Sequence, residues 1–144
     1  MKCVQFETVG EPRDVLQVVE RDLPAPQHGE VRVRMLASPV NPSDLMFVRG
    51  TYGVKPSLPQ VPGFEGVGVV EESGGGLRGK IFRGKRVAVL NKSGGNWAAQ
   101  TVVPADQVIP LSSSLSLEQA ATFFVNPATV WIMTQEVLKI PSGA

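Results

Sequence analysis

The chain has 144 residues and a mass of 15.4 kDa, which is enough for one compact domain and too little for two full ones. Hydrophobic residues make up 42% of it and charged residues 19%, so a core can form without metal or disulfide staples. Its 14 Lys and Arg residues balance 13 Asp and Glu residues, for a net charge of +1. The charges are scattered without a basic stripe, which argues against nucleic acid as a partner.

The chain has a single cysteine, Cys3, and a single histidine, His28. This count excludes a disulfide within the chain and a Cys/His zinc site of the usual three or four ligands. The first residues reach Glu7 and Glu11 before any long apolar run, which is not the pattern of a secretory or transit peptide. No apolar run reaches the roughly 18 residues that span a bilayer. We therefore expect a metal-free cytoplasmic protein that does not enter a membrane.

Up to about residue 110, short apolar runs separated by Gly and Pro predict many short strands. The clearest is GEVRVRML at 29–36, where apolar Val31 and Val33 alternate with Arg32 and Arg34, giving one buried and one wet face. Further strands are predicted at 3–6, 15–19, 67–70, 86–90 and 97–103, and long loops at 38–66 and 73–84. The expected fold class is mainly β with C-terminal helices.

Two helices are predicted after Pro110. The sequence SLEQ at 116–119 fits a capping box and predicts a helix to about residue 124. Asn126 is expected to be the N-cap and Pro127 the first residue of a second helix that runs to residue 139. Apolar side chains cover most of the circumference of this second helix, so we expect it to need a packing partner beyond a small β-domain. These side chains are Val130, Trp131, Met133, Val137 and Leu138.

Few residues suit proton chemistry. Tyr52, the only tyrosine, lies in the glycine-flanked segment RGTYG and is the best available proton donor. A structural role, in which its ring packs into its own loop, is an equally good interpretation. Glu65, in the glycine-rich segment GFEG, must find a hydrogen-bonding or charged partner to stay ionised, and a role in binding loop amides is expected. The sequence GVGVVE at 66–71 is an incomplete dinucleotide fingerprint and indicates a tight turn that enters a strand.

Other candidates have structural interpretations. The segment from Asn41 to Asp44, NPSD, suits a turn or a helix start. His28 is expected in a surface turn, and Cys3 as an inert small hydrophobic residue in the first strand. Trp97 fits the core and a pocket wall equally well. Composition and spacing thus indicate a β-rich domain with a tyrosine-bearing loop and do not impose a chemistry.

Four segments in order resemble the medium-chain dehydrogenase/reductase superfamily. They are NPSDLMFVRGTYG at 41–53, PGFEGVGVV at 62–70, GGNWAAQTVVP at 94–104 and AATFFVNPATVW at 120–131. The resemblance covers nearly the whole chain and implies a GroES-like, partly open β-barrel at 1–125. It also implies that 126–144 form a helix leading toward a nucleotide-binding Rossmann domain that is absent from this chain.

Zinc-dependent members of that superfamily carry a Cys in the segment that is 41–44 here and a His at the position of Phe64. The resemblance is therefore to the zinc-free branch, which holds quinone oxidoreductases and 2-enoyl thioester reductases. It implies that Tyr52 is the proton donor, that Asn41, Thr129 and, more weakly, Asn126 contact the cofactor or substrate, and that two further residues lie near the pocket, Asp44 and Trp97.

The implied reaction is the NADPH-dependent reduction of an activated C=C bond in a 2-enoyl thioester, by a protein that is a homodimer when complete. Two alternatives stay open: an NADPH:quinone oxidoreductase, and a non-catalytic fragment or interaction module. Because no glycine fingerprint follows a strand and opens a helix, we expect the 144-residue chain alone to bind NADPH poorly and to be inactive.

Overall fold

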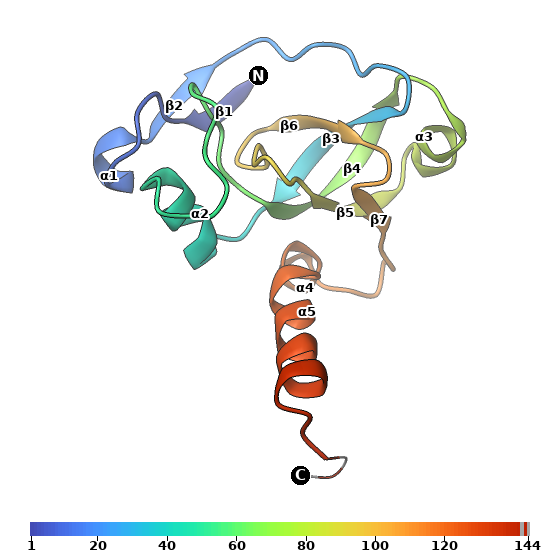
Figure 1. The fold of residues 1–144 in the computed structure, drawn as a ribbon. Coiled ribbons are helices and arrows are strands. Elements are labelled where there is room, and N and C mark those ends of the chain that lie inside the picture. Colours follow the sequence, from blue (N-terminus) through green and yellow to red (C-terminus); the bar gives the residue numbers. More distant parts are fainter. Residues whose placement is uncertain (142, 144) are drawn as a thin grey trace.

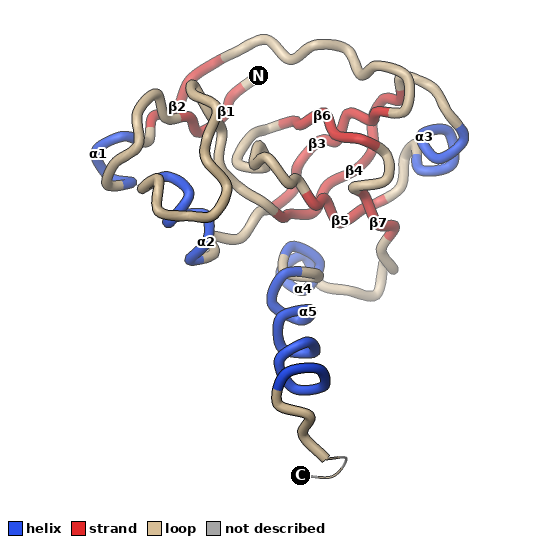
Figure 2. The backbone as a smooth tube through the Cα atoms, viewed as in Figure 1, coloured by secondary structure: helices blue, strands red, loops and turns tan. Residues whose placement is uncertain are grey.

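The computed structural model describes residues 1–141 and 143, and contains two antiparallel sheets (Figures 1 and 2). In the smaller sheet, β1 (Lys2–Gln5) pairs with β2 (Gln17–Glu20). The larger sheet has the order β6-β3-β4-β5-β7 and is open, with β6 and β7 at its edges. Its strands are β3 (Glu30–Ala37), β4 (Glu65–Ser73), β5 (Arg86–Leu90), β6 (Gln100–Pro104) and β7 (Val108–Pro110). The prediction of a mainly β chain with C-terminal helices is confirmed.

The largest cluster of buried side chains lies against the larger sheet and consists mostly of valines. In β3, Val31 and Val33 are fully buried while Arg34 is exposed, so the predicted alternation is confirmed. The glycines of GVGVVE do not form a turn as expected, because Gly66 and Gly68 lie inside β4. A Cβ atom on Gly68 would come within 2.4 Å of the Val33 side chain, so the glycine allows β3 and β4 to approach closely.

Both segments predicted as long loops contain a short helix, α2 (Pro42–Val48) in the first and α3 (Leu77–Phe82) in the second. The predicted strand at 15–19 starts late, at Gln17, because α1 (Pro12–Val15) precedes it, and β7 was not predicted. In α2 the helix-start interpretation of NPSD is confirmed: Pro42 is the first helical residue, and the Asp44 carboxylate accepts the N–H of Asn41 at 2.8 Å. Phe47 and Val48 bury the inner face of α2 against Phe6.

The first C-terminal helix, α4 (Leu117–Ala121), has the predicted capping box. Ser116 Oγ accepts the Gln119 N–H at 3.2 Å, and Gln119 Oε1 accepts the Ser116 N–H at 2.9 Å. The second helix, α5 (Val125–Trp131), continues into a π-helical stretch, η1 (Ile132–Val137). The prediction that Asn126 caps this helix is wrong, because the helix begins at Val125 and a side chain from β4 accepts its first amides.

The helix α5 points away from the sheet (Figure 1). As predicted, the apolar side chains from α5 to Leu138 find no packing partner among the described residues: Trp131 is 60% exposed and Leu138 is 61% exposed. Residues 142 and 144, at the end of the predicted segment 126–144, lie outside the described residues. No helix in the part of the chain that the structure describes combines the length and the apolar character needed to cross a membrane.

Candidate active site

Glu65, the first residue of β4, joins three elements through its buried carboxylate. Its Oε2 atom accepts the backbone N–H of Val125 at 2.9 Å and that of Phe124 at 3.4 Å, at the start of α5. Its Oε1 atom accepts the side-chain amide of Asn41 at 2.8 Å, just before α2. The prediction that Glu65 binds backbone amides is confirmed, but these amides lie about 60 residues away in the sequence and could not be identified from it.

Asn41 is buried, with 6% of its surface exposed, and its side chain bonds on both sides. Besides the bond to Glu65, its Oδ1 atom accepts the side-chain amide of Asn126 at 3.4 Å. Among the described residues, one hydrogen of the Asn41 amide nitrogen has no partner. The structure therefore makes Asn41 a link between Glu65 and Asn126, with at most one N–H left for a bound molecule.

Asp44 lies in the first turn of α2 and is 1% exposed. Its two oxygens accept the N–H of Asn41 at 2.8 Å and the N–H of Phe64 at 3.1 Å. Burial raises the pKa of the Asp44 carboxyl and the nearby Glu65 charge adds to the rise, while the two backbone hydrogen bonds oppose it. The carboxylate faces backbone amides and attaches α2 to the segment before β4.

Tyr52 lies in the loop after α2, with its ring against Phe64. The two ring centroids are 5.4 Å apart, and Phe64 in turn contacts Phe47 edge to face at 5.0 Å. Tyr52 is 36% exposed, and its hydroxyl forms no hydrogen bond with the described residues. The ring thus packs beside its own loop, and the role of the O–H as a proton donor stays a prediction.

The remaining predicted site residues lie at the margin of this group. Thr129 is exposed on α5, and its hydroxyl donates to the Val125 carbonyl at 2.7 Å. Trp97 is partly buried, and its indole N–H donates to the Pro39 carbonyl at 3.1 Å, while a Cβ on Gly63 would lie 2.5 Å from its ring. Trp97 also borders a hollow of about 400 Å³ between β3 and the segment before β6.

The structure therefore connects most of the predicted residues in one series of contacts: Tyr52, Phe64, Asp44, Asn41, Glu65 and Asn126. Thr129 follows one helical turn after Val125, and Trp97 contacts the loops that carry Asn41 and Phe64. Within residues 1–141 and 143, no group of three His, Cys, Asp or Glu side chains could hold a metal ion. Two minor predictions are confirmed as well, since His28 lies exposed in a turn and Cys3 is buried in β1, where burial raises its thiol pKa.

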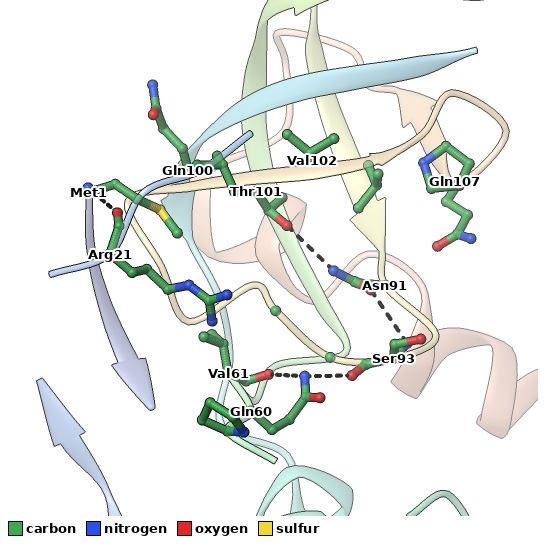
Figure 3. Close-up of a pocket in the computed structure, with 16 residues that line it drawn as sticks. Met1, Arg21, Gln60, Val61, Asn91, Ser93, Gln100, Thr101, Val102 and Gln107 are labelled. Carbon is green, nitrogen blue, oxygen red and sulfur yellow. Dashed lines mark hydrogen bonds between the residues drawn. The ribbon is translucent and has the colours of Figure 1, made fainter. Parts of the chain in front are cut away.

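A second hollow, of about 460 Å³, is lined in part by β6 and is shown in Figure 3. Its polar side chains mainly bond to one another and to the backbone. Gln60 donates to the carbonyls of Val61 and Ser93, both at 2.9 Å, and Asn91 donates to the Thr101 hydroxyl at 3.4 Å. None of the predicted site residues borders this hollow.

Comparison with known proteins gives consistent matches over nearly the whole chain. The chain is 37% identical over 139 residues to the mitochondrial enoyl-[acyl-carrier-protein] reductase of Caenorhabditis elegans, covering 96% of this chain and 40% of that protein. A crystal structure of a putative NADPH:quinone reductase from Bacillus thuringiensis is 39% identical, with a TM-score of 0.86 over 96% of this chain and 41% of that one. The structure of Etr1p with NADP and crotonyl-CoA is 31% identical, with a TM-score of 0.77 over 94% of this chain and 43% of that one.

The chain thus spans about two fifths of the length of the relatives that it matches. Residues 27–113, more than half of the chain, match the family model of the alcohol dehydrogenase GroES-like domain. The open antiparallel sheet and the flanking short helices agree with that match. The chain therefore belongs to the alcohol dehydrogenase GroES-like domain family, within the medium-chain dehydrogenase/reductase superfamily.

Proposed function

We propose that this chain is the catalytic-domain portion of a zinc-independent, NADPH-dependent oxidoreductase that reduces the C=C bond of 2-enoyl thioesters. The observation that carries the proposal is the free hydroxyl of Tyr52, whose ring lies against Phe64 beside the Asp44–Asn41–Glu65 group. In this proposal, residues 1–125 form the catalytic domain and 126–144 lead toward a nucleotide-binding domain.

The names of the similar proteins support the substrate class and the cofactor. The nematode relative is an enoyl-[acyl-carrier-protein] reductase, and the Etr1p structure holds NADP and an enoyl thioester, crotonyl-CoA. The aromatic side chain of Phe64 stands where zinc-dependent members carry a His, and this supports a reaction without zinc. Because the nematode relative is mitochondrial, the cytoplasmic location stays a prediction, as does the homodimer.

The exposed polar groups near α5 fit the carboxamide and hydroxyl groups of a nicotinamide nucleotide. Asn126 is exposed and keeps its side-chain carbonyl free as an acceptor among the described residues, and the Thr129 hydroxyl oxygen keeps acceptor capacity beside its bond to Val125. Asn41 contributes one remaining N–H. When bound, NADPH supplies the hydride that reduces the β-carbon of the substrate.

Within this proposal Tyr52 completes the reduction by donating its phenolic proton to the α-carbon. As the hydride reaches the β-carbon, negative charge builds on the thioester oxygen, and protonation of the α-carbon removes that charge. In this proposal the contact with Phe64 orients the Tyr52 ring. Asp44 and Glu65 are poor candidates for the proton donor, because both carboxylates are buried and bonded to amides.

The test is Tyr52→Phe in the complete oxidoreductase that contains this chain. Removing the hydroxyl should lower the turnover of enoyl reduction about 10²-fold or more, since a positioned acid contributes that much, while NADPH affinity stays the same. The matched control is Thr51→Val, which removes the neighbouring hydroxyl that bonds only to the Met46 carbonyl at 3.3 Å. Near-normal turnover of Tyr52→Phe would refute the role of Tyr52.

Reduction of quinones is the second candidate, favoured by the 39% identity to a protein named as an NADPH:quinone reductase. A reduced quinone can take its protons from water, so this reaction needs no positioned acid. Activity on quinones that is insensitive to Tyr52→Phe would favour this candidate. The third candidate is a non-catalytic module. Calorimetric titration of NADPH into the 144-residue chain should show no binding, and micromolar binding would show that the chain holds the cofactor by itself and would argue against this candidate.

A further inference from the structure

The helix α5 carries two of the proposed cofactor contacts, Asn126 and Thr129, yet it is weakly anchored by packing. No residue of α5 is buried, and its large apolar side chains Val130 and Trp131 are 61% and 60% exposed. The preceding helix α4 differs, because its Ala120 and Ala121 are buried in a cluster with Val67 of β4. Something other than apolar burial must therefore set the direction in which the chain leaves α4 and enters α5.

The described contacts that attach the start of α5 to the sheet are polar, and they converge on Glu65. One carboxylate oxygen accepts the N–H groups of Phe124 and Val125, which are among the first amides of the helix and have no acceptor within it. The other oxygen holds the Asn41 amide, whose carbonyl accepts the side chain of Asn126. A negative charge at this place is also favoured by the positive end of the helix dipole.

We infer that Glu65 is a positioning residue: its buried carboxylate fixes the start of α5 against β4 and α2, and so sets where Asn126 and Thr129 point. The consequence for cofactor binding by Asn126 and Thr129 rests on the function proposed above. The positioning of the start of α5 by Glu65 does not. Glu65 does not act on substrate in this account. It acts through Val125 and through Asn41.

The hydrogen-bond pattern can be broken and then restored by exchanging two side chains. In Glu65→Gln, an oxygen can still face Val125, but the new NH₂ group then points at the NH₂ group of Asn41, and two donors oppose each other. In the double variant Glu65→Gln/Asn41→Asp, the NH₂ group of Gln donates to the new carboxylate, whose second oxygen can accept the Asn126 amide. The double variant has the same formal charge as the original pair.

The experiment is amide hydrogen exchange by NMR on the 144-residue chain, with the side-chain amide resonance of Asn126 as a second readout. In Glu65→Gln the new side chain must either set its NH₂ group against that of Asn41 or turn this NH₂ group toward Val125, whose N–H then loses its acceptor. The amide of Val125 should therefore exchange roughly 10- to 100-fold faster, and the Asn126 resonance should shift because the Asn41 side chain is displaced. The Val70 amide, which donates to the Lys85 carbonyl at 3.1 Å, reports whether the sheet is intact and should not change.

The double variant should restore both the slow exchange of Val125 and the Asn126 resonance. The matched control is Glu72→Gln, the same substitution in the same strand, on a half-exposed side chain that pairs with Arg32 at 2.9 Å. It should leave both readouts unchanged. The inference is wrong if Glu65→Gln leaves the exchange of Val125 unchanged, or if the double variant exchanges as fast as the single one.

If Glu65→Gln unfolds the chain, the double variant decides the question, since its refolding supports the inference and continued unfolding refutes it. These readouts need neither NADPH nor substrate. They are therefore independent of Tyr52→Phe, which should leave both the exchange of Val125 and the Asn126 resonance as they are. A failed assay for enoyl reduction would refute the proposed function without affecting the positioning role.

Discussion

The ring of Tyr52 lies against the ring of Phe64, with 5.4 Å between centroids and 42° between the planes. Phe64 also contacts Phe47, which is buried on the inner face of α2. The loop that carries Tyr52 is thereby attached to the core through aromatic contacts. The phenolic oxygen is free, while the ring that carries it has a defined neighbour.

This aromatic series predicts that Phe64 matters for stability as well as for the position of Tyr52. Phe64→Ala should lower the free energy of unfolding by about 2 kcal/mol, roughly half the usual cost for a fully buried phenylalanine, because Phe64 is only partly buried. Urea unfolding measures the loss. The control is Phe123→Ala, on a side chain that is 38% exposed, and an equal loss in this control would contradict the argument.

The close approach of β3 and β4 predicts that Gly68 cannot be replaced. A Cβ atom there would lie 2.4 Å from Val33 Cγ1 and 2.5 Å from the Arg34 carbonyl oxygen, and the backbone oxygen cannot move aside without disturbing the sheet. Gly68→Ala should therefore lower the free energy of unfolding by at least about 1 to 3 kcal/mol, the usual cost of overpacking.

The matched control for this prediction is Gly53→Ala. Gly53 has open space around its Cβ position and no positive φ, so the substitution should be neutral or stabilise the fold by about 0.4–1 kcal/mol through the unfolded chain. Both variants can be compared by thermal or urea unfolding. Equal stabilities of the two variants would show that β3 and β4 have room for a side chain at Gly68.

Asp44 predicts a dependence of stability on pH. Because burial raises the pKa of its carboxyl, the folded protein binds a proton at pH values where the unfolded chain has already released it. The stability that this proton contributes is fully present below the ordinary pKa of Asp and is lost as the pH rises through the raised pKa of the folded state. The free energy of unfolding, relative to that of Asp44→Ala, should therefore fall with rising pH.

Urea unfolding of the wild type and Asp44→Ala between about pH 3 and about pH 6 covers the expected window, which begins near the ordinary pKa of Asp. Asp14→Ala, which removes an exposed carboxylate, is the control for the loss of a negative charge. A difference between wild type and Asp44→Ala that grows with rising pH would contradict the predicted direction.

The exposed apolar side chains between α5 and Leu138 predict concentration-dependent self-association of the chain. Trp131 is 60% exposed, Met133 51% and Leu138 61%, and exposed apolar surface promotes association. Light scattering should show a mass that rises with concentration, and the double variant Trp131→Glu/Leu138→Glu should reduce the rise. The control Leu77→Glu changes an apolar side chain, 76% exposed on α3, that lies outside the C-terminal segment and should have little effect. A monodisperse monomer at high concentration would refute the prediction.

The elements that the sequence predicted well are those with local signals. The alternation in β3, the strand β5 at Arg86–Leu90 and the capping box of α4 all follow from spacing within a few residues. The error at Asn126 has the opposite cause. An Asn before a Pro is a good local cap, but the Glu65 carboxylate, from another element, accepts the Val125 amide, and the helix starts two residues earlier than predicted.

The candidate site shows the same difference between features with local sequence signals and features that depend on contacts between distant segments. The sequence by itself determined that the chain is mainly β, that it has no Cys/His zinc site, and that Tyr52 is its only phenol, because these depend on composition and short-range periodicity. Only the tertiary structure decided that Phe64 supports Tyr52, that Asn41 is engaged by Glu65 and Asn126, and that Glu65 holds the start of α5. The physical reason is that a buried carboxylate needs donors in space, whatever their distance in sequence, and the folding of β4 beside α2 and α5 supplies them.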